Sequence, residues 1–401
     1  MSPLGRPPVF IDIVEEHFDE LDFLWEQREA NVYTPDWTLR QLAEHEERVE
    51  AHLDGLRVAE LHAIDLARER IGDGTSAAAA ATFVLWEAGE PEYLDLVFSH
   101  LGGDDVAITD GVRSALRHGD VKRMKAPLLQ LVTGTATAPA AAAADVLAFH
   151  RQPVAALEQL MRSAGPWERT LALGAAGRLR RLRDQDLAEA LEHPEPAVRL
   201  AAMQAGARAA IPGLAARCRS AASRGTDPDA DALAFLGVLG EPQDLALMQK
   251  AVARKDLAEA ALRGVGAMGN VQAIPSLIEL MADKALGVFA TAAYRRITGA
   301  TNVEGERPFP PPPVAEGEDE EEALPPDPAK AADDWRKRSN AMPADQAWQA
   351  GLAVNETVLA NGFDRLPLES RRDVYLRLCH RSEGGVPDLE LEALAIRQRR
   401  N

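Results

Sequence analysis

Three glycines in the second half of the chain match, letter by letter, the fingerprint of dinucleotide-binding proteins. They read Gly264-x-Gly266-x-x-Gly269. In such proteins the glycines follow a β-strand and let a pyrophosphate approach the backbone at the start of a helix. Here no strand is predicted before them, and they lie at the end of an expected helix. We therefore interpret Gly264 and Gly266 as positions of close helix packing and Gly269 as a turn residue.

Histidine and cysteine side chains are the next candidates for chemistry. Zinc hydrolases place two histidines at i and i+4 on one helix with a glutamate between them, whereas His45 and His52 are seven residues apart. Cys218 lies between Arg217 and Arg219, and neighbouring guanidinium groups lower the pKa of a thiol. A packed thiol and helix-packing histidines are nevertheless the simpler interpretation. The sequence thus predicts no catalytic residue, no metal ligand and no cofactor.

Arginines make the middle of the chain locally basic, although the 401 residues together carry a formal charge of -19. Guanidinium groups bind carboxylates and phosphates through forked hydrogen bonds. If several of them line one groove, that groove would bind an anionic partner. The candidate partner-binding residues are Arg178, Arg181, Arg199, Arg208 and Arg217. The alternative is that the arginines are solvated or form pairs within the chain, with acids such as Asp184, Asp186, Glu189 and Glu195.

A proline-rich and acidic stretch is a candidate occupant of such a groove. Pro310–Pro313 favours extended polyproline structure. The acidic residues at 316–322 repel one another and are poor in apolar neighbours, so this part is not expected to pack. We predict a linker or exposed acidic arm here, which would bind the arginines of its own chain.

The elements that position these residues repeat about every 30 residues. An alanine-rich helix is followed by a short turn and a second helix, and the turns include Gly89-Glu90-Pro91 and Gly240-Glu241-Pro242. Repeats of two helices are typical of solenoids, in which neighbouring units share one apolar core. The first helices are expected at 77–88, 105–118, 137–149, 166–180, 195–208, 227–239 and 256–267. The predicted fold is all-α, a HEAT-like α-solenoid of about seven helical hairpins.

Two longer helices precede the repeats. Apolar residues at spacings of three and four, beginning with Phe10 and Ile13, predict a helix from about residue 9 to 31. Thr38 is expected to cap a second helix at 38–71. After the repeats, a short helical segment is suggested by Trp335, Trp348, Leu352, Val354 and Leu359, and two more follow it. We divide the chain into an N-terminal helical cap (1–74), a repeat array (75–300), a proline-rich acidic linker (301–334) and a C-terminal helical segment (335–401).

Charge and composition restrict the partners. A strongly acidic chain is a poor general nucleic-acid binder, because such proteins neutralise phosphates with basic residues. It is equally unsuited to an anionic membrane surface. The chain shows no signal peptide and no run of about 18 apolar residues that would insert into a membrane. Cys218 and Cys379 are too few for a zinc module or a disulfide framework. We expect a cytoplasmic protein.

Three stretches of the N-terminal helices carry a resemblance to a known family. They are Phe23-Leu24-Trp25-Glu26-Gln27-Arg28, Leu39-x-x-Leu42, and Glu46-Glu47-Arg48-Val49-Glu50-Ala51-His52-Leu53-Asp54-Gly55-Leu56-Arg57. With 293–299 and the segment around Trp335, they are similar to a bacterial family of uncharacterised HEAT-repeat-like proteins. Members are often associated with type VI secretion gene clusters. The resemblance implies an accessory role in secretion and transfers no catalytic residue.

The residues of this family motif are interpreted as structural. They are Trp25, Arg28, His52, Asp54, Gly55 and Arg57. Trp25 is expected to anchor the first helix against the second, since a large ring stabilises a helix contact by burial. Gly55 lets another helix approach. Asp54 and Arg57, three residues apart, can form an ion pair on the helix surface.

These observations favour a non-enzymatic scaffold or adaptor that binds a protein partner on the curved face of the solenoid. The resemblance implies a type VI secretion setting, with a secretion component, an effector or a toxin as the partner. One alternative is an immunity-type binder that neutralises a toxin, because an acidic surface suits a basic toxin. Another is an enzyme on a HEAT-like scaffold, of the lyase or base-glycosylase type. A glycosylase needs a basic groove, which the net charge opposes.

Overall fold

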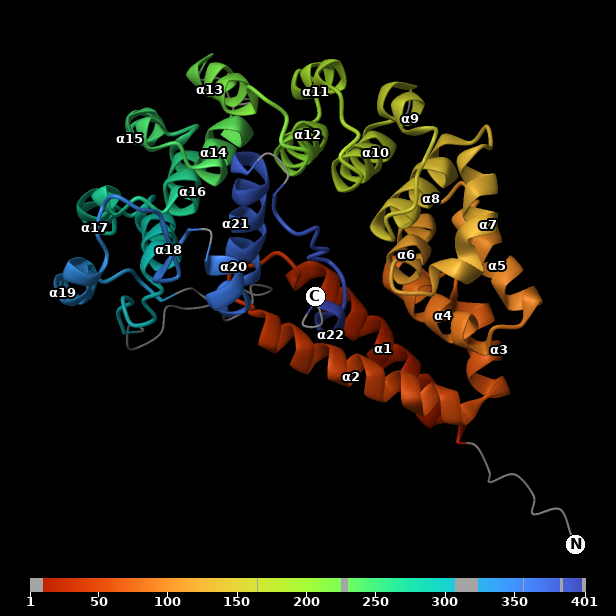
Figure 1. The fold of residues 1–401 in the computed structure, drawn as a ribbon. Coiled ribbons are helices and arrows are strands. Elements are labelled where there is room, and N and C mark those ends of the chain that lie inside the picture. The colour runs from red at the N-terminus through yellow and green to blue at the C-terminus, as the bar shows by residue number, and fades with distance from the viewer. Residues whose placement is uncertain are drawn as a thin grey trace, which may run out of the picture. The chain divides into compact units, whose positions relative to one another are not determined.

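Helices form almost all of the regular structure in the computed structural model of the chain (Figure 1). The structure describes residues 10–163, 165–224, 230–306, 324–355, 357–382 and 385–398. Within these residues the only strands are β1 (Trp348–Gln349) and β2 (Leu352–Ala353), which pair antiparallel. The predicted all-α, solenoid-like fold is confirmed. None of the described helices combines the length and the apolar character needed to cross a membrane.

The chain divides into two compact units. The first comprises Met1–Ala209 and Pro387–Asn401, and the second comprises Ala210–Val386. The helices of the first unit are α1 (Ile11–Asn31), α2 (Leu39–Ala59), α3 (Leu61–Arg70), α4 (Thr75–Ala88), α5 (Pro91–Leu101), α6 (Val106–Leu116), α7 (Val121–Val132), α8 (Thr137–Phe149), α9 (Leu157–Ser163), α10 (Pro166–Arg178), α11 (Asp184–Leu191), α12 (Pro196–Arg208) and α22 (Ala395–Gln398). The second unit contains the elements between α12 and α22 in sequence.

The repeat helices of the first unit form two rows (Figure 1). Helices α4, α6, α8, α10 and α12 pack side by side as an inner row, and α5, α7, α9 and α11 form an outer row. The inner helices are rich in buried alanine, as in Ala140–Ala144, because small side chains let helices approach closely. At Gly111 of α6, a Cβ atom would lie 2.0 Å from the carbonyl oxygen of Thr75. The core of the unit lies between the two rows.

The N-terminal helices differ from the prediction at two points. Phe10 and Ile13 are 67% and 49% exposed, and burial in α1 begins only at Val14. The helix expected at 38–71 is broken at Glu60, whose φ is 47°, and α3 then packs against α4. Thr38 caps α2 as predicted, since its side chain accepts a hydrogen bond from the Gln41 amide.

The second unit continues the pattern of helical pairs. Its elements are α13 (Leu214–Arg224), α14 (Ala230–Leu239), η2 (Pro242–Asp244), α15 (Leu245–Val252), α16 (Ala258–Met268), η3 (Val271–Ala273), α17 (Ile274–Leu280), α18 (Gly287–Thr298), α19 (Pro328–Arg338), η4 (Ser339–Ala341), α20 (Val358–Asn361), η5 (Phe363–Arg365) and α21 (Leu368–Arg381). Gly264 packs against the main chain of α14, and Gly269 ends α16 with a φ of 75°. The interpretation of these glycines as packing and turn residues is confirmed.

Of the short helical segment predicted from Trp335 to Leu359, Trp335 lies in α19, but the part around Trp348 is wrong because a tight hairpin forms there. Ala350 and Gly351 both have positive φ, at 49° and 75°, and turn the chain back on itself. The Trp348 amide also donates to the Gly269 carbonyl at 2.9 Å, which holds β1 against the end of α16. Left-handed residues do not continue an α-helix, so the turn excludes the predicted helix.

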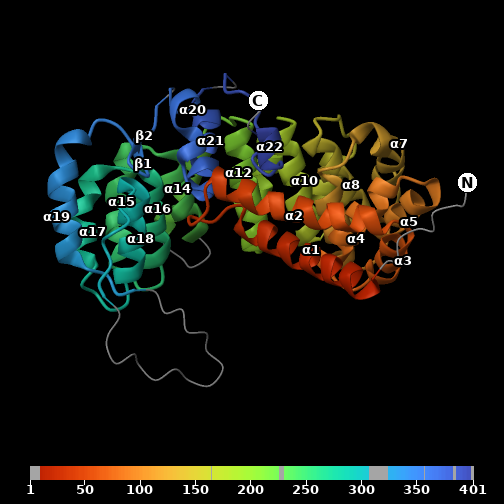
Figure 2. The same ribbon diagram turned by 90° about the horizontal axis from the view of Figure 1, so that it is seen from below.

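The described ends of the predicted linker are held together. An isolated β-bridge joins Glu304 and Pro326, and the Asp327 amide donates to the Val303 carbonyl at 3.1 Å. Helix α19 begins at Pro328, within the expected linker, and lies beside α17 (Figure 2). The acidic arm at 316–322 lies outside the described residues.

Candidate functional site

A series of arginines lies at the C-terminal ends of the inner helices in the first unit. Arg117 follows α6, Arg151 follows α8, Arg178 ends α10 and Arg208 ends α12. We call these residues the arginine row. Because each repeat places its helix end at an equivalent position, the guanidinium groups recur along the inner row. The partial negative charge of the helix C-termini favours cations there.

The C-terminal segment Asp388–Glu392 of the same unit lies on the arginine row. Glu392 has three partners: Arg178 Nη2 lies 3.0 Å from Glu392 Oε2, Arg117 forms a second ion pair, and the Tyr33 hydroxyl donates a hydrogen bond. Burial alone would raise the pKa of Glu392. The charges of Arg117 and Arg178 and the hydrogen bond from Tyr33 outweigh burial and hold this pKa well below its ordinary value. The carboxylate is therefore ionised at neutral pH.

The next two acids of the segment contact the remaining arginines. Glu390 Oε2 accepts hydrogen bonds from Arg178 Nε at 3.1 Å and Arg208 Nη2 at 3.2 Å. Asp388 Oδ2 lies 2.8 Å from Arg151 Nε. The three acids occupy alternate positions of the segment, and a turn in which the Ala393 amide donates to the Glu390 carbonyl at 3.2 Å precedes the short helix α22.

One buried carboxylate underlies the row. Asp145 of α8 accepts a hydrogen bond from Arg113 Nη1 at 2.7 Å and another from Arg178 Nη1 at 2.7 Å, and it lies 2.6 Å from Arg117 Nη2. Burial would raise the pKa of Asp145, but the charges of these arginines outweigh it and lower the pKa. A single carboxylate does not neutralise three guanidinium groups. The positive charge that remains is met by Glu392 and its neighbour in the C-terminal segment.

The main chain of the C-terminal segment is also bound. The Leu389 carbonyl accepts from Arg208 Nη2 at 2.6 Å, and the Glu392 carbonyl accepts from Arg28 Nη2 at 2.7 Å. Hydrogen bonds to backbone carbonyls recognise the main chain without regard to side-chain type. The arrangement is therefore suited to an acidic peptide.

The structure separates the arginines predicted to bind a partner. Arg178 and Arg208 belong to the arginine row and share the C-terminal segment. Arg181 is exposed just after α10. Arg217 lies in α13 and so belongs to the second unit. The predicted set therefore does not form one site.

Other arginines of the basic region stabilise turns and ion pairs within the chain. Arg199 donates to the carbonyls of His193 and Pro194 at 2.9 and 2.7 Å, which holds the turn before α12. Arg183 Nε lies 2.7 Å from Asp186 Oδ2 on the outer row. Arg199 and Arg183 therefore have partners within the chain, as the alternative prediction stated.

Sequence reasoning missed the acids that occupy the row. We considered the acidic arm at 316–322 as an intramolecular ligand, whereas the described structure places 388–392 there. Two signals were available. Acidic and apolar residues alternate through 388–392, and Arg117 and Arg151 recur near the C-terminal ends of expected helices.

Trp25 of the family motif connects α1 to the repeats. Its Nε1 donates to Ser114 Oγ at 3.0 Å, and its ring packs edge-on against Phe83 and His118. Trp25 thus anchors α1 against α4 and the end of α6. This anchoring contact differs from the one with the second helix that we predicted.

Among the other motif residues, His52 and Gly55 lie where α2 packs against α1. His52 Nδ1 lies 3.1 Å from His17 Nδ1, and a Cβ atom on Gly55 would lie 2.5 Å from the His17 ring. The predicted close approach at Gly55 is confirmed. Asp54 and Arg57 form the predicted ion pair.

The remaining candidates for chemistry have packing roles. His45 is buried, and its Nε2 lies 2.7 Å from the Leu24 carbonyl oxygen. Cys218 is also buried, which raises the pKa of its thiol to about 12, so the predicted packed thiol is confirmed. Across the described ranges, no group of three or more His, Cys, Asp or Glu side chains is arranged to hold a metal ion.

A comparison with models of known protein families and with curated proteins found no match. The interpretation of the arginine row therefore rests on its geometry and charge.

Proposed function

We propose that the chain is a non-enzymatic protein-binding scaffold, and that its arginine row binds an acidic segment of a partner. The observation that carries this proposal is the seating of Asp388–Glu392 on the row. Three carboxylates at alternate positions meet successive guanidinium groups, and backbone carbonyls accept from Arg28 and Arg208. An acidic segment of a partner would make the same contacts.

The resemblance of the N-terminal helices supports a setting for this scaffold. We infer that it acts as an accessory protein of a type VI secretion system in the bacterial cytoplasm, with a secretion component or an effector as its partner. An acidic recognition segment suits the arginine row better than a basic toxin would, because like charges repel. The row therefore favours the scaffold over the immunity-type binder.

The C-terminal segment would compete with the partner. Because it belongs to the same chain, its effective concentration at the row is of millimolar order. A partner segment must therefore bind more tightly than the tethered segment, or present several copies. The tethered segment would therefore prevent acidic ligands of low affinity from occupying the arginine row.

The test uses the full chain and weakens the tethered competitor. A variant with Glu390→Gln and Glu392→Gln should bind a fluorescent peptide of residues 387–398 at least tenfold more tightly than the unaltered chain, by anisotropy. Affinity should fall with added salt, since the contacts are ionic. A peptide with glutamine and asparagine in place of its acids is the matched ligand control.

A second substitution tests the row itself. In the same background, Arg208→Gln should weaken binding of the acidic peptide, whereas Arg181→Gln, at an exposed residue outside the row, should not. Equal binding of the acidic and the neutral peptide to the correctly folded double variant would overturn the proposal.

A further inference from the structure

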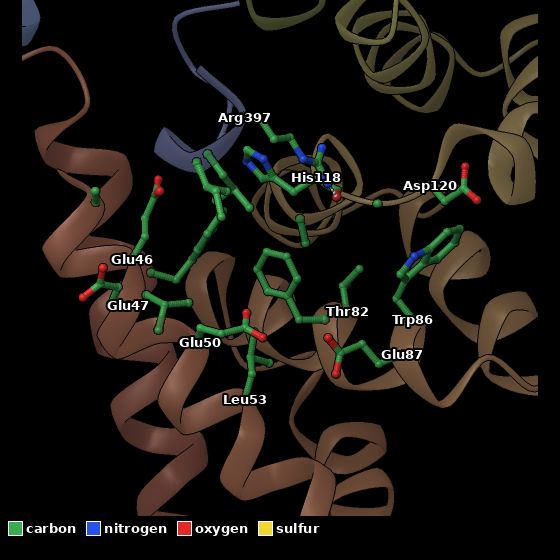
Figure 3. Close-up of a pocket in the computed structure, with 18 residues that line it drawn as sticks. Glu46, Glu47, Glu50, Leu53, Thr82, Trp86, Glu87, His118, Asp120 and Arg397 are labelled. Carbon is green, nitrogen blue, oxygen red and sulfur yellow. Dashed lines mark hydrogen bonds between the residues drawn. The ribbon is translucent and has the colours of Figure 1, made fainter. Parts of the chain in front are cut away.

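A cavity of about 620 Å³ lies in the first unit among α2, α4, the end of α6 and residues 394–397 (Figure 3). This volume falls within the range of small-molecule sites. Much of its wall is apolar, formed by Val49 and Leu53 and by the rings of Trp25, Phe83 and Trp86. Aromatic rings offer an incoming ligand both apolar area and the negative faces of their π systems.

Carboxylates surround this apolar wall. They come from Glu46, Glu47 and Glu50 of α2, and from Glu87 and Asp120 on other elements (Figure 3). Among the described residues that line the cavity, carboxylates therefore outnumber cationic side chains, of which Arg397 is the one present.

Not all of these carboxylates are neutralised by the chain. Glu46 Oε1 lies 3.0 Å from Arg28 Nε, and both Glu50 and Glu87 contact Arg57. Glu47 is exposed and forms no ion pair with any described residue. An incoming cation would therefore find a carboxylate that is not already paired.

His118 is a buried polar side chain of this wall. It is 7% exposed, and its Nδ1 has no hydrogen-bond partner among the described residues. Burial, together with the charges of Arg28, Arg397 and Arg117, lowers the pKa of His118 well below its ordinary value. The imidazole is therefore neutral and has a ring nitrogen able to accept a hydrogen bond.

We propose that this cavity binds a small organic cation with an apolar body, of the aryl-alkyl ammonium class. The apolar body would contact the rings, and the ammonium group would lie among the carboxylates, close to Glu47. The chain already contains one such contact, because the Arg123 guanidinium lies 4.6 Å from the centroid of the Trp86 ring. An anion of the same shape would be repelled by the acidic rim.

Residues 394–397, which follow the C-terminal segment, complete the cavity. Leu394 and Ile396 line it with Arg397, whose Nη2 donates to the His118 carbonyl. The Ala395 amide donates to Glu46 Oε2 at 2.7 Å. A ligand that contacts this wall would favour the seated segment, so ligand binding and segment release oppose each other.

The test compares three ligands of similar size on the full chain by isothermal titration calorimetry: 4-phenylbutylammonium, 4-phenylbutan-1-ol and 4-phenylbutanoate. We expect the ammonium ligand to bind with one-to-one stoichiometry and at least tenfold more tightly than the carboxylate, with the alcohol between them. Equal binding of ammonium and carboxylate, or no saturable binding of any ligand at millimolar concentration, would overturn the proposal.

Variants locate the site. Glu47→Gln should weaken the ammonium ligand about two- to fivefold and leave the alcohol unchanged. Glu44→Gln removes an exposed carboxylate of the same helix that does not line the cavity, and should change neither affinity. Ala43→Trp, which places an indole in the cavity, should abolish binding of both ligands. Unchanged ammonium binding in the folded Ala43→Trp and Glu47→Gln variants would place the ligand elsewhere and refute the assignment.

Discussion

The guanidinium of Arg178 lies 3.0 Å from the carboxylate of Glu392, although the whole second unit separates the two residues in sequence. The same guanidinium lies 2.7 Å from Asp145 and 3.1 Å from Glu390. Arg178 is 6% exposed. Since one buried arginine is shared by an inner helix and by the C-terminal segment, the packing of α8 and α10 and the seating of the segment are energetically coupled.

Replacing the buried carboxylate should destabilise the first unit. Asp145→Asn keeps the shape of the side chain but leaves three guanidinium groups without their shared anion. We expect a loss of about 3–5 kcal/mol in the free energy of unfolding, measured by urea denaturation. Asp110→Asn removes another, 32% exposed partner of Arg113 and should cost less than about 1 kcal/mol. Equal losses in the two variants would contradict the coupled network.

Acid should release the C-terminal segment only at low pH. The folded-state pKa of Glu392 lies below its ordinary value, so the ionised carboxylate stabilises the folded unit. This contribution is fully present above the ordinary glutamate pKa of about 4.3, and it is lost as pH falls through the lower folded-state value. Hydrogen exchange at 387–398 should therefore stay slow at pH 5, after correction for intrinsic rates. Glu392→Gln should exchange faster at that pH, and an equally slow exchange in this variant would refute the assignment.

Arg151→Gly should preserve the turn at this position but remove the ion pairs of the arginine side chain. Arg151 has a φ of 57° and Arg180 a φ of 52°, in turns where Gly89 and Gly240 serve other repeats. Glycine relieves about 1 kcal/mol of left-handed strain, so Arg151→Gly should change unfolding free energy little while exchange in 387–398 accelerates. Arg180→Gly makes the same backbone change outside the arginine row and should leave that exchange unchanged. Acceleration by both variants would assign the effect to the turn itself.

Arg377 should be a major stabilising residue of the second unit. It is 1% exposed, and it donates to the carbonyls of Gly237, Val238 and Met268 at 2.9, 2.8 and 3.2 Å, which closes the ends of α14 and α16. Arg377→Met should cost about 3 kcal/mol, because these buried acceptors lose their donor. Hydrogen exchange in α14 and α16 would report the loss. Arg381→Met, on the same helix, removes an exposed guanidinium that donates to the Gly240 carbonyl at 2.6 Å; it should cost less, and an equal effect there would argue against the buried cap.

The two cysteines should be inert in the folded chain. Both are buried, and burial raises the pKa of Cys218 to about 12, so little thiolate is present at pH 8. A thiol-reactive disulfide reagent should label neither cysteine in the native state and both in denaturant. Rapid labelling of one native thiol would contradict the burial of that residue.

The sequence predicts the repeat helices well because their signal is local. Alanines are concentrated in 137–149 and 166–178 and favour helix locally, and the structure places α8 and α10 there. The helix break at Glu60 could not be predicted, because neither Glu60 nor its two sequence neighbours is a glycine or a proline. The hairpin at Trp348 depends on a hydrogen bond to Gly269, which is distant in sequence. Elements that depend on distant contacts leave little local pattern.

The candidate site is harder to predict for the same reason. Local basic charge identifies Arg178 and Arg208, but it does not distinguish them from Arg199, which holds a turn. Which arginines converge is decided by their position at the ends of inner helices. Glu390 reaches these arginines only because the chain returns to the first unit after the second. No local sequence pattern predicts that return.

The return of the C-terminal segment to the first unit also fixes an order of events during synthesis. Glu390 follows Arg208 by 182 residues, so a ribosome requires roughly 10–40 s to reach it at typical elongation rates. Throughout that interval the nascent inner helices present guanidinium groups without the acids that later cover them. A partner present at the ribosome would meet this surface before the chain's own segment exists, so the timing of translation could decide which of them binds first.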